Sequence, residues 1–547
     1  MISTRWSVLP ADPVRAGVLA SQVGIHPVTA QLLLNRRVSD PAAAKRFFTP
    51  TLETLSDPYQ LPDMAAALAR LRQAIAAREP IVIFGDSDVD GLTASVILYE
   101  ALAECGARVE AVQANRITDG YGLPAALVTR LCRSATRVVI LVDCGTNQPQ
   151  EIAQLAAHGI DTIIVDHHIP LDGWAQPVAL INPFQREGMG RELCSAGLSF
   201  MLARALRAAL VRTVEDDGLE LAALGTLSDC APLTGENRAL VAQGLARILE
   251  SRRRGLQSLC EATKTTMPEP EQITTRLIPR LNASGRLGDS AASWHLLRRD
   301  GHDEIEHWLT QADTAHAQTK QLHRRTMAEA QEQVDRLHFR DEWVMVVSRV
   351  GWHQGVMGPL AAQLASRYGR PAIAIAWGED CGIGSGRSIP LFNLLNALKA
   401  CEGLLVRFGG HAQACGLTVD RKNVERFRAF VNEHAQRAMG REGLVPRRTV
   451  DLEMSLAGIQ PEWVAGLERF APFGRGNERP SVLVRNITLE VTSPRIGAVV
   501  DGPRRIAARG RFADLECGQR YDAIVIPTLA RGELLLSVSD VKGAGGL

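Results

Sequence analysis

The sequence predicts an α/β protein of several domains that ends in a small β-barrel of the OB type. Three patterns in its 547 residues support this prediction. Short apolar runs alternate with helical stretches between about residues 80 and 230, which is typical of a parallel sheet covered on both faces. A second α/β pattern lies within residues 341–440, and closely spaced β-like runs follow it. At roughly 100–200 residues per domain, this length favours three or four domains.

In chain order, the sequence divides into five segments. Residues 1–60 are expected to be a helical lead-in, since apolar residues recur at helical spacing after Pro27 and Asp40. Residues 61–302 begin with an amphipathic helix from Met64 and continue with the alternating pattern, so they are expected to form the first α/β domain. The remaining segments are a polar connecting helix over 303–340, a second α/β domain over 341–440 and the OB-like barrel over 441–547.

Composition narrows the class of protein. With 46% hydrophobic and 22% charged residues, the chain has the make-up of a globular protein, which excludes disordered and fibrous classes. No apolar run approaches the roughly 18 residues of a membrane span, and the N-terminus has no signal-peptide pattern. Ten cysteines without a C-x-x-C pair argue against structural zinc and a disulfide scaffold. We therefore expect a cytoplasmic protein, while a net charge of +1 leaves nucleic-acid binding open.

Acidic and histidine side chains follow the apolar runs of the first α/β domain. Asp86, Asp88 and Asp90 come after the first run, Asp143 after the second, and the triplet 166–168 (Asp-His-His) after the third. Since parallel strands end at one edge of a sheet, these groups are expected to converge. Carboxylates with one or two imidazoles suit Mn²⁺ or Mg²⁺ better than zinc. Helix capping is the alternative, and we expect it for one of the first three aspartates.

A series of motifs resembles those of the DHH phosphoesterase superfamily, and within it the RecJ family of bacterial single-stranded-DNA-specific exonucleases. In chain order the motifs lie at Asp86–Gly91, Asn115–Gly122, Val142–Gly145, Asp166–His168, Gly235–Arg238, Pro279–Arg286, Gly351–Gly355, Gly384–Ser388, Gly409–Gly416 and Pro472–Asn477. The resemblance runs from the helical lead-in to about residue 440, and its last motif reaches into the tail.

This resemblance implies a set of catalytic side chains. The implied metal ligands are Asp86, Asp88, Asp143, His167 and Asp229. Asp143 would bridge two divalent cations, Mn²⁺ or Mg²⁺, and His168 would face the scissile phosphate. By itself, Asp229 has the pattern of an ordinary helix cap. The sequence departs from the family at Ser87, where an aromatic residue is usual. Some branches of the superfamily place a metal-binding histidine shortly before the first aspartate, and residues 80–84 contain none, so one metal position is expected to be weaker or more hydrated.

Basic residues are expected to hold the nucleic acid. Arg116, Arg280 and Arg286 lie in stretches that predict Gly/Asn-rich turns, and the guanidinium fork suits phosphate contact. The resemblance implies that Arg280, Asn282 and Arg286 contact the substrate backbone. It also implies that the glycine-rich loop predicted at 382–388 captures a terminal 5′ phosphate. The residues chosen for this end recognition are Ser385 and Arg387, with His411 beside them.

The barrel segment offers a second place for single-stranded DNA. Its β-like runs carry four arginines, with Phe512 and Tyr521 nearby, and OB folds bind single strands through a basic groove and stacking aromatic rings. A solvated strand face explains the same pattern equally well. The arginines are Arg504, Arg505, Arg509 and Arg511.

The resemblance implies a metal-dependent 5′→3′ exonuclease that degrades single-stranded DNA to mononucleotides in DNA repair or recombination. A narrow channel between the two α/β domains would exclude a duplex. We expect a monomer, with a helicase and a single-strand-binding protein as partners and no membrane association. Two alternatives stay open: a phosphodiesterase of short RNA oligonucleotides or cyclic dinucleotides, and an inactive DNA-binding scaffold.

Overall fold

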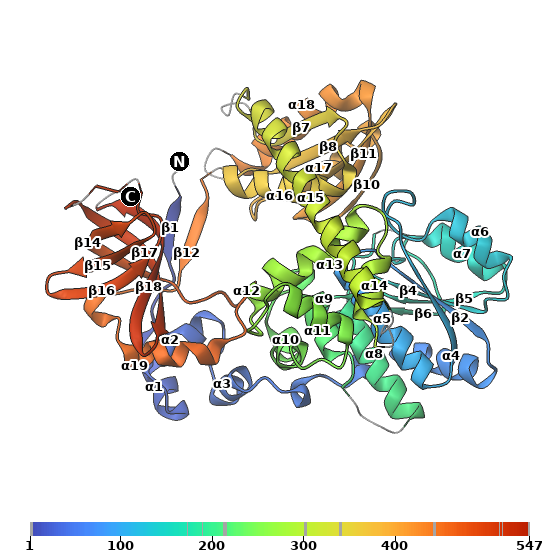
Figure 1. Cartoon of the computed structure of the whole chain (residues 1–547), viewed down its shortest axis with the longest axis horizontal. Helices are drawn as coiled ribbons and strands as arrows, with labels where there is room; N and C mark the ends of the chain where they lie inside the picture. Colours follow the sequence, from blue (N-terminus) through green and yellow to red (C-terminus); the bar gives the residue numbers. More distant parts are fainter. Residues whose placement is uncertain are drawn as a thin grey trace. The chain divides into compact units, whose positions relative to one another are not determined.

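The computed structural model describes most of the chain, which forms two compact units (Figure 1). The described residues are 4–171, 173–188, 190–211, 216–299, 304–337, 342–440, 445–513, 515–516 and 518–544. One unit contains residues 1–54, 232–234 and 445–547, and the other contains 55–231 and 235–444. The expected segment borders at 302/303, 340/341 and 440/441 touch residues outside the described ranges, so these borders stay predictions.

The larger unit begins with a five-stranded parallel sheet, as the alternating pattern predicts. Its order is β3-β2-β4-β5-β6, and every neighbouring pair is parallel. The central strand β4 is buried along its whole length, which explains its uninterrupted apolar run. The strands are β2 (Pro80–Gly85), β3 (Arg108–Gln113), β4 (Val138–Val142), β5 (Asp161–Val165) and β6 (Ala179–Ile181).

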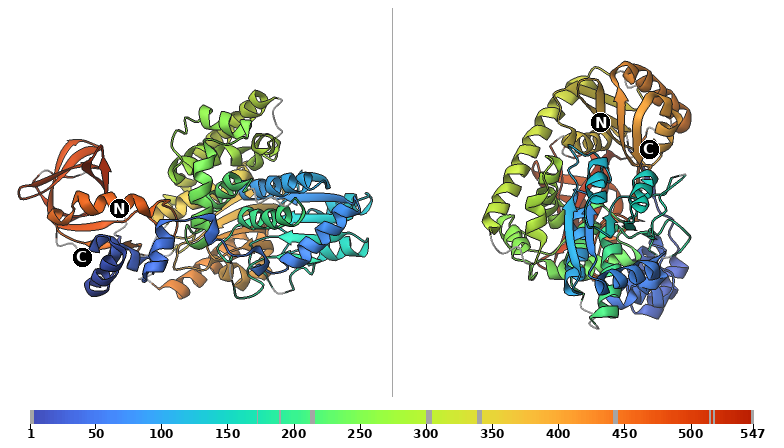
Figure 2. Two further views of the ribbon diagram at one scale, coloured as in Figure 1. Left: turned by 90° about the horizontal axis from the view of Figure 1, so that it is seen from below. Right: turned by 90° about the vertical axis from the view of Figure 1, so that its right-hand side faces the viewer.

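Helices cover both faces of this sheet (Figures 1 and 2). Two helices pack with one face of the sheet in a single apolar core, and three cover the other face. The first two are α6 (Ala125–Cys132) and α7 (Pro149–Ala157), and the other three are α4 (Met64–Ala76), α5 (Val89–Glu104) and α8 (Ser195–Leu210).

A helical region follows, and it corrects one prediction. Arg280, Asn282 and Arg286 do not lie in turns, because the segment that carries them is helix α13. A Cβ atom at Gly285 would lie 2.4 Å from the backbone oxygen of Ser87, so this glycine is needed for close packing. The helices are α9 (Leu219–Ser228), α10 (Gly235–Ile248), α11 (Arg254–Ala262), α12 (Pro270–Gln272), α13 (Ile278–Arg286) and α14 (Ala291–Leu297), with a π-helix over Ile273–Leu277.

Helix α15 (Ile305–Val334) leads from this region to a second sheet, as the right-hand view of Figure 2 shows. The sheet order is β10-β11-β9-β8-β7, in which only the β7–β8 pair is parallel. The strands are β7 (Met345–Val350), β8 (Ala372–Trp377), β9 (Cys381–Arg387), β10 (Leu405–Gly410) and β11 (Ala414–Asp420), and the helices are α16 (Met357–Tyr368), α17 (Leu394–Ala400) and α18 (Val424–Met439).

Strand β9 corrects a second prediction, because the glycine-rich loop expected at 382–388 is mostly a strand. Its glycines alternate and face the core. A Cβ atom at Gly382 would lie 2.5 Å from the Ile375 side chain, and one at Gly386 would lie 2.5 Å from Leu394. The glycines are thus required by packing, and Ser385 and Arg387 point to the opposite face of the sheet.

The smaller unit is a β-barrel joined by the N-terminal helices, which share one apolar core with it. Its sheet order β13-β14-β15-β16-β18-β17 is closed by pairing of β14 with β17, as expected for an OB-like barrel. Strand β1 (Arg5–Val8) pairs in parallel with β12 (Arg447–Val450), so the lead-in is not entirely helical. The other elements are α1 (Pro13–Val23), α2 (Pro27–Asn35), α3 (Pro41–Phe48), β13 (Leu452–Glu453), α19 (Pro461–Val464), β14 (Val482–Ser493), β15 (Ile496–Asp501), β16 (Arg504–Arg509), β17 (Arg520–Ala530) and β18 (Glu533–Gly543).

The two aromatic residues considered for base stacking lie inside the barrel. Phe512 and Tyr521 are 1% and 6% exposed and belong to its core. Arg505 pairs with Glu490 at 2.8 Å on an exposed face. The solvated-face interpretation of these strands is therefore favoured over stacking by these two rings.

Two further predictions can be compared with the described residues. The nine cysteines among them are all free thiols. No single helix in this part of the chain is long and apolar enough to cross a membrane, although the bent pair α1–α2 has the necessary length and composition when its two helices are taken together.

A buried ion cluster fastens α5 to the helical region. The Arg253 side chain is 1% exposed, and its guanidinium binds Glu100 with two hydrogen bonds of 2.7 and 2.8 Å and Glu220 with one of 2.8 Å. It also donates to the backbone oxygen of Leu297 at 2.8 Å. Removing one partner of such a cluster leaves buried charge uncompensated.

We predict that Arg253→Met lowers the stability of the larger unit by about 3–5 kcal/mol. Glu220 loses its buried counter-ion, and Glu100 keeps only the more distant Arg299, at 3.9 Å. The midpoint of urea unfolding, followed by circular dichroism, measures this change. Arg325→Met is the matched control, since the Arg325 side chain is 78% exposed and a surface ion pair contributes about 0–1 kcal/mol. Equal midpoints for the two variants would contradict the prediction.

Candidate active site

The first two aspartates lie where β2 runs into α5. Asp86 is 1% exposed, and a Cβ atom at Gly91 would lie 2.5 Å from its backbone oxygen, so the start of α5 closes tightly over it. Asp88 is the N-cap of α5, and its Oδ1 accepts hydrogen bonds from the backbone N–H groups of Asp90 and Gly91 at 3.1 and 3.2 Å. The expected capping role therefore falls to Asp88, whose second carboxylate oxygen remains for a ligand.

Asp143 follows β4 with an unusual backbone. Its φ of +62° lies in the left-handed region, which is uncommon for a residue other than glycine. The Asp143 carboxylate accepts a hydrogen bond of 2.9 Å from Ser195 Oγ. His167 Nε2 lies 3.4 Å from Asp143 Oδ1. The strand end thus places this carboxylate within reach of Ser195 on α8 and of His167 in the Asp-His-His triplet.

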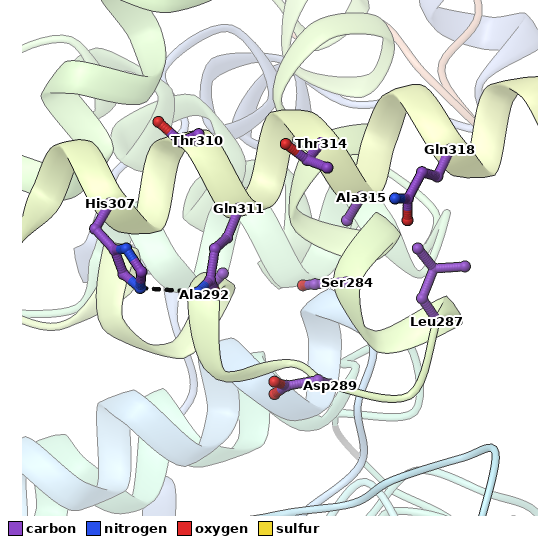
Figure 3. A pocket seen from close by; sticks show the side chains of 10 residues that line it. All are labelled: Ser284, Leu287, Asp289, Ala292, His307, Thr310, Gln311, Thr314, Ala315 and Gln318. Atoms are coloured by element: carbon purple, nitrogen blue, oxygen red, sulfur yellow. Dashed lines mark hydrogen bonds between the residues drawn. The ribbon is translucent and has the colours of Figure 1, made fainter.

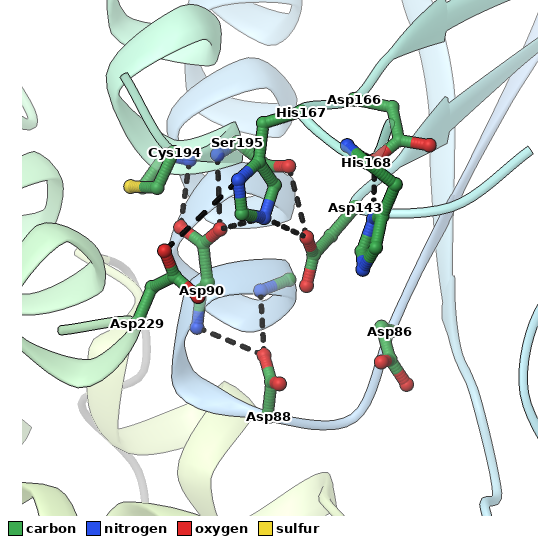
Figure 4. A network of polar contacts seen from close by, with 12 residues as sticks. Asp86, Asp88, Asp90, Asp143, Asp166, His167, His168, Cys194, Ser195 and Asp229 are labelled. Carbon is green, nitrogen blue, oxygen red and sulfur yellow. Dashed lines mark hydrogen bonds and ion pairs between the residues drawn. The ribbon is translucent and has the colours of Figure 1, made fainter. Parts of the chain in front are cut away.

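The Asp-His-His triplet after β5 divides into an anchor and two ring side chains (Figure 4). Asp166 is buried and accepts hydrogen bonds from the Thr146 backbone at 3.2 Å and from His168 Nδ1 at 2.7 Å. Burial raises the pKa of Asp166, but its contacts with His168 hold that pKa below the usual range. The His167 ring points the other way, and its Nδ1 lies 4.0 Å from Asp229.

Asp90 is a site residue whose role the sequence does not reveal. It is 2% exposed, and its oxygens accept hydrogen bonds from the backbone N–H groups of Ser195 and Ala196 at 2.9 and 2.8 Å. Those groups lie in the first turn of helix α8, so Asp90 fixes the start of this helix. Ser195, whose hydroxyl binds Asp143, is thereby held in position. The D-x-D-x-D spacing marks Asp90, but only the fold shows what it holds.

Two groups of potential ligand atoms form among the described residues. The atoms of each group lie within 4.8 Å of one another, and Asp143 is common to both. Asp229, a predicted ligand, lies outside these groups. His168 belongs to one of them, although it was expected to face the phosphate and not to be a ligand. The groups are Asp86, Asp88 and Asp143, and Asp143, His167 and His168.

The electrostatics of this cluster favour a cation. Burial, followed by the charges of Asp90 and Asp88, raises the pKa of Asp143 well above its usual value. Burial also raises the pKa of Asp229, to about 6. The negative charges of these carboxylates repel one another, most of all around the buried Asp143, and a divalent cation would compensate them. Hard oxygens with imidazole nitrogen fit Mn²⁺ or Mg²⁺.

Three of the predicted substrate contacts are engaged within the protein. The Arg116 guanidinium pairs with Asp86. The Asn282 side chain accepts from the Val89 backbone at 3.0 Å and donates to Ser228 Oγ at 3.3 Å.

Arg280 is the third of these contacts. Its guanidinium pairs with Asp313 of α15 at 2.8 Å. Asn282 and Arg280 therefore connect helices of the described structure.

Ser385 and Arg387 lie side by side on β9. Arg387 Nη1 donates to Ser385 Oγ at 2.9 Å, and a Cβ atom at Gly358 in the first turn of α16 would lie 3.1 Å from Arg387 Nη2. Burial lowers the pKa of both Arg387 and Arg286, and the positive charge of Arg116 lowers both further. The guanidiniums of Arg116, Arg286 and Arg387 are thus close enough to repel one another, and a bound anion would reduce this repulsion.

His411 reaches the first α/β domain from the second. Its ring stacks on His168 with centroids 5.1 Å apart and an interplanar angle of 14°. Burial, then the positive charges of His168 and His167, lowers the pKa of His411 to about 4. His353, in contrast, accepts from the Gly355 backbone N–H at 3.1 Å and caps a short helix.

A separate cavity of about 370 Å³ lies between α15 and the α13–α14 region (Figure 3). None of the predicted site residues lines it. The lining residues are Ser284, Leu287, Asp289, Ala292, His307, Thr310, Gln311, Thr314, Ala315 and Gln318.

Three regions of the chain match known protein families. Residues 80–226 match the N-terminal domain of the DHH family, residues 343–437 match the DHHA1 domain, and residues 450–499 match the RecJ OB domain.

Two curated relatives carry the description single-stranded-DNA-specific exonuclease RecJ. The relative from Bacillus subtilis is 33% identical over 492 residues, which are 89% of this chain and 62% of that protein. The relative from Thermus thermophilus is 32% identical over 486 residues, which are 88% of this chain and 69% of that protein. The chain thus spans less than two thirds of the length of the Bacillus protein.

Solved structures agree with this relationship. The crystal structure of RecJ from Thermus thermophilus in complex with Mn²⁺ superposes with a TM-score of 0.86 at 27% identity, covering 99% of this chain and 80% of that one. A manganese-bound structure of exonuclease RecJ gives a TM-score of 0.60 at 31% identity over 70% of this chain and 96% of that one.

We predict that Mn²⁺ binding weakens as the pH falls from about 7.5 to about 5.5. The pKa of the Asp143 carboxyl is raised well above its usual value and that of Asp229 to about 6, so protons compete with the cation for the same oxygens. The apparent affinity should fall about tenfold per pH unit for each proton displaced. Isothermal titration calorimetry measures it, and an affinity that is constant over this range would contradict the prediction.

Proposed function

Because the chain belongs to the RecJ family of single-stranded-DNA-specific exonucleases, we propose that it hydrolyses the phosphodiester bonds of single-stranded DNA. We further propose that it works from the 5′ end and releases mononucleotides. The observation that carries the hydrolytic proposal is Asp143, which belongs to both groups of ligand atoms in the DHH region. A carboxylate in that position suits a bridge between two cations.

The proposed ligands are those that the resemblance implies. Asp86, Asp88 and Asp143 would hold one divalent cation, and Asp143, His167 and Asp229 would hold the second. When bound, such cations supply a deprotonated water and neutralise charge on the phosphate. The position of Asp229, 4.0 Å from His167, supports its inclusion. Ser87 replaces the usual aromatic residue, and the carboxylates on either side of it belong to one group of potential ligand atoms.

His168 is proposed to contact the scissile phosphate. Its Nδ1 donates to Asp166, which fixes the ring orientation and directs Nε2 away from that anchor. The stacked ring of His411 restrains it from a second side.

End recognition is proposed at Ser385 and Arg387. Support comes from the adjoining guanidinium of Arg286 and from the first turn of α16, where Gly358 leaves room beside Arg387. A guanidinium, a hydroxyl and a helix N-terminus together suit the doubly charged terminal phosphate. Arg280, Asn282 and Arg286 remain the proposed contacts of the substrate backbone, and Arg116 remains a further proposed contact of the nucleic acid. Arg116, Arg280 and Asn282 would first have to leave their present partners.

Selection of single strands is proposed to result from the close approach of the two α/β domains. Gln354 donates to the Ile117 backbone oxygen at 3.0 Å, and a Cβ atom at Gly355 would lie 2.0 Å from the Arg286 backbone oxygen. Contacts this tight beside the site support a passage that a single strand enters and a duplex does not.

The proposed setting follows from the substrate. Single strands must be produced and kept unpaired, so a helicase and a single-strand-binding protein are the proposed partners. All of the site residues come from one chain, so a monomer is sufficient. Free thiols suit the reducing cytoplasm. An inactive scaffold would be expected to lose its carboxylates, and this chain retains them.

We predict that Asp143→Asn reduces hydrolysis of single-stranded DNA by at least about 10³-fold in Mn²⁺, because the shared ligand loses its charge. Asparagine tolerates the left-handed backbone at this position, so the fold should persist. Digestion of strands labelled at either end measures the activity, and circular dichroism checks the fold. Asp289→Asn, at the separate cavity, is the matched control. A folded Asp143→Asn variant that retains activity would refute the bridging role.

We predict that Arg387→Ala lowers kcat/KM for 5′-phosphorylated strands by about 10–100-fold, because a charge-assisted contact with the phosphate is lost. Strands with a 5′ hydroxyl should be affected much less. Arg349→Ala serves as control, since that side chain lies half-exposed on the same domain. A similar loss for both kinds of end would show that Arg387 does not read the phosphate.

A further inference from the structure

The loop after β3 carries a tyrosine that contacts two residues of the candidate active site. The Tyr121 hydroxyl donates to the backbone oxygen of Asp143 at 3.2 Å. It also lies 3.1 and 3.2 Å from the two ring nitrogens of His168. One hydroxyl group therefore contacts both the shared carboxylate residue and the histidine proposed to face the phosphate.

The contact with Asp143 falls on the part of that residue that needs support. A φ of +62° is less favourable than the right-handed and extended regions even for aspartate, so contacts with neighbouring groups help to hold it. The Asp143 backbone N–H donates to Val165 at 3.0 Å, and Ser195 Oγ binds the carboxylate at 2.9 Å. The Tyr121 hydroxyl holds the remaining polar group, the carbonyl oxygen. A small rotation of this peptide would move the carboxylate away from both groups of ligand atoms.

The contact with His168 completes the set of restraints on that ring. Asp166 binds Nδ1 at 2.7 Å, and His411 stacks on one face. The Tyr121 ring approaches His168 edge-on, with centroids 5.4 Å apart and an interplanar angle of 63°. Tyr121 is 37% exposed, so its position does not result from burial in a core.

The second α/β domain holds the same tyrosine through its backbone. Arg407 of β10 donates from Nη2 to the Tyr121 carbonyl oxygen at 3.1 Å. A Cβ atom at Gly120 would lie 3.9 Å from Arg407 Nη1, so the guanidinium lies along the loop. The domain that carries the proposed 5′-phosphate residues on β9 thus contacts the active-site loop through β10.

We propose that Tyr121 is a positioning residue, whose hydroxyl fixes the Asp143 peptide and the His168 ring, and that Arg407 acts through Tyr121 by fixing its backbone. This inference rests on the proposed function, and it adds a residue that assists both the metal ligand and the histidine. Outer contacts of this kind typically change metal affinity or activity by about 10–100-fold when removed.

Tyr121→Phe is the test variant, because it removes the hydroxyl and keeps the ring. We expect kcat on a long single strand in saturating Mn²⁺ to fall about 10–100-fold, and Mn²⁺ affinity to weaken by about tenfold. KM and the melting temperature should stay close to those of the unmodified protein. Tyr59→Phe is the matched control, since Tyr59 is 56% exposed and outside the site.

A role in packing or base stacking predicts a different result. If Tyr121 acted by packing, the variant would have a lower melting temperature. If it acted by stacking on a base, Tyr121→Phe would behave like the unmodified protein, because phenylalanine keeps the ring, and only removal of the ring would raise KM. A kcat and Mn²⁺ affinity within twofold of the unmodified protein would overturn the proposal. Should the unmodified protein fail to cleave DNA, the proposed function fails, and Mn²⁺ affinity, measured by calorimetry, still decides the role of Tyr121.

The part assigned to Arg407 requires a double-mutant cycle. Arg407→Ala should lower kcat in the unmodified protein but cause no further loss in the Tyr121→Phe background, because its effect passes through the tyrosine. An equal loss in both backgrounds would overturn this part, since it would show that Arg407 acts on the substrate independently.

Discussion

Repulsion between buried carboxylates is the constraint on which this structure depends. Parallel strands β2 and β4 end at one edge of the sheet, and each delivers an aspartate into a place with little water. Asp143 combines two unfavourable features, since the residue is only 3% exposed and its backbone is left-handed. Such an arrangement persists only where surrounding groups fix it and cations compensate it. The first turn of α8 holds two of these charges in place, through the Ser195 hydroxyl on Asp143 and the Ser195 and Ala196 backbone N–H groups on Asp90.

The Asp-His-His triplet shows how one short segment serves two purposes. Asp166 turns inward and anchors His168, whereas His167 turns toward Asp143 and Asp229. The second α/β domain adds His411, which stacks on His168. The two domains therefore meet at the side chains that the proposed chemistry requires, and the proposed end-recognition residues stand on the domain that supplies this contact.

Much of this arrangement is predictable from the sequence, and the exceptions have physical reasons. Apolar runs indicate the parallel sheet, and the acids that follow them indicate the site, because strand ends in such sheets share an edge. Two predictions based on glycine residues were wrong. Gly285 and the alternating glycines of β9 resemble turn or loop residues, but they are required by close packing in a helix and a strand. Asp90 and Tyr121 act on backbone groups that only the fold brings near, so no sequence pattern reveals their roles.

Anomalous X-ray scattering from crystals grown with Mn²⁺ tests the central claim most directly. Our account predicts two manganese peaks within coordination distance of the Asp143 carboxylate, one beside Asp86 and Asp88 and the other beside His167. Crystals that contain Mn²⁺ elsewhere but show no peak at Asp143 would contradict it, because the carboxylates would then be compensated by some other means.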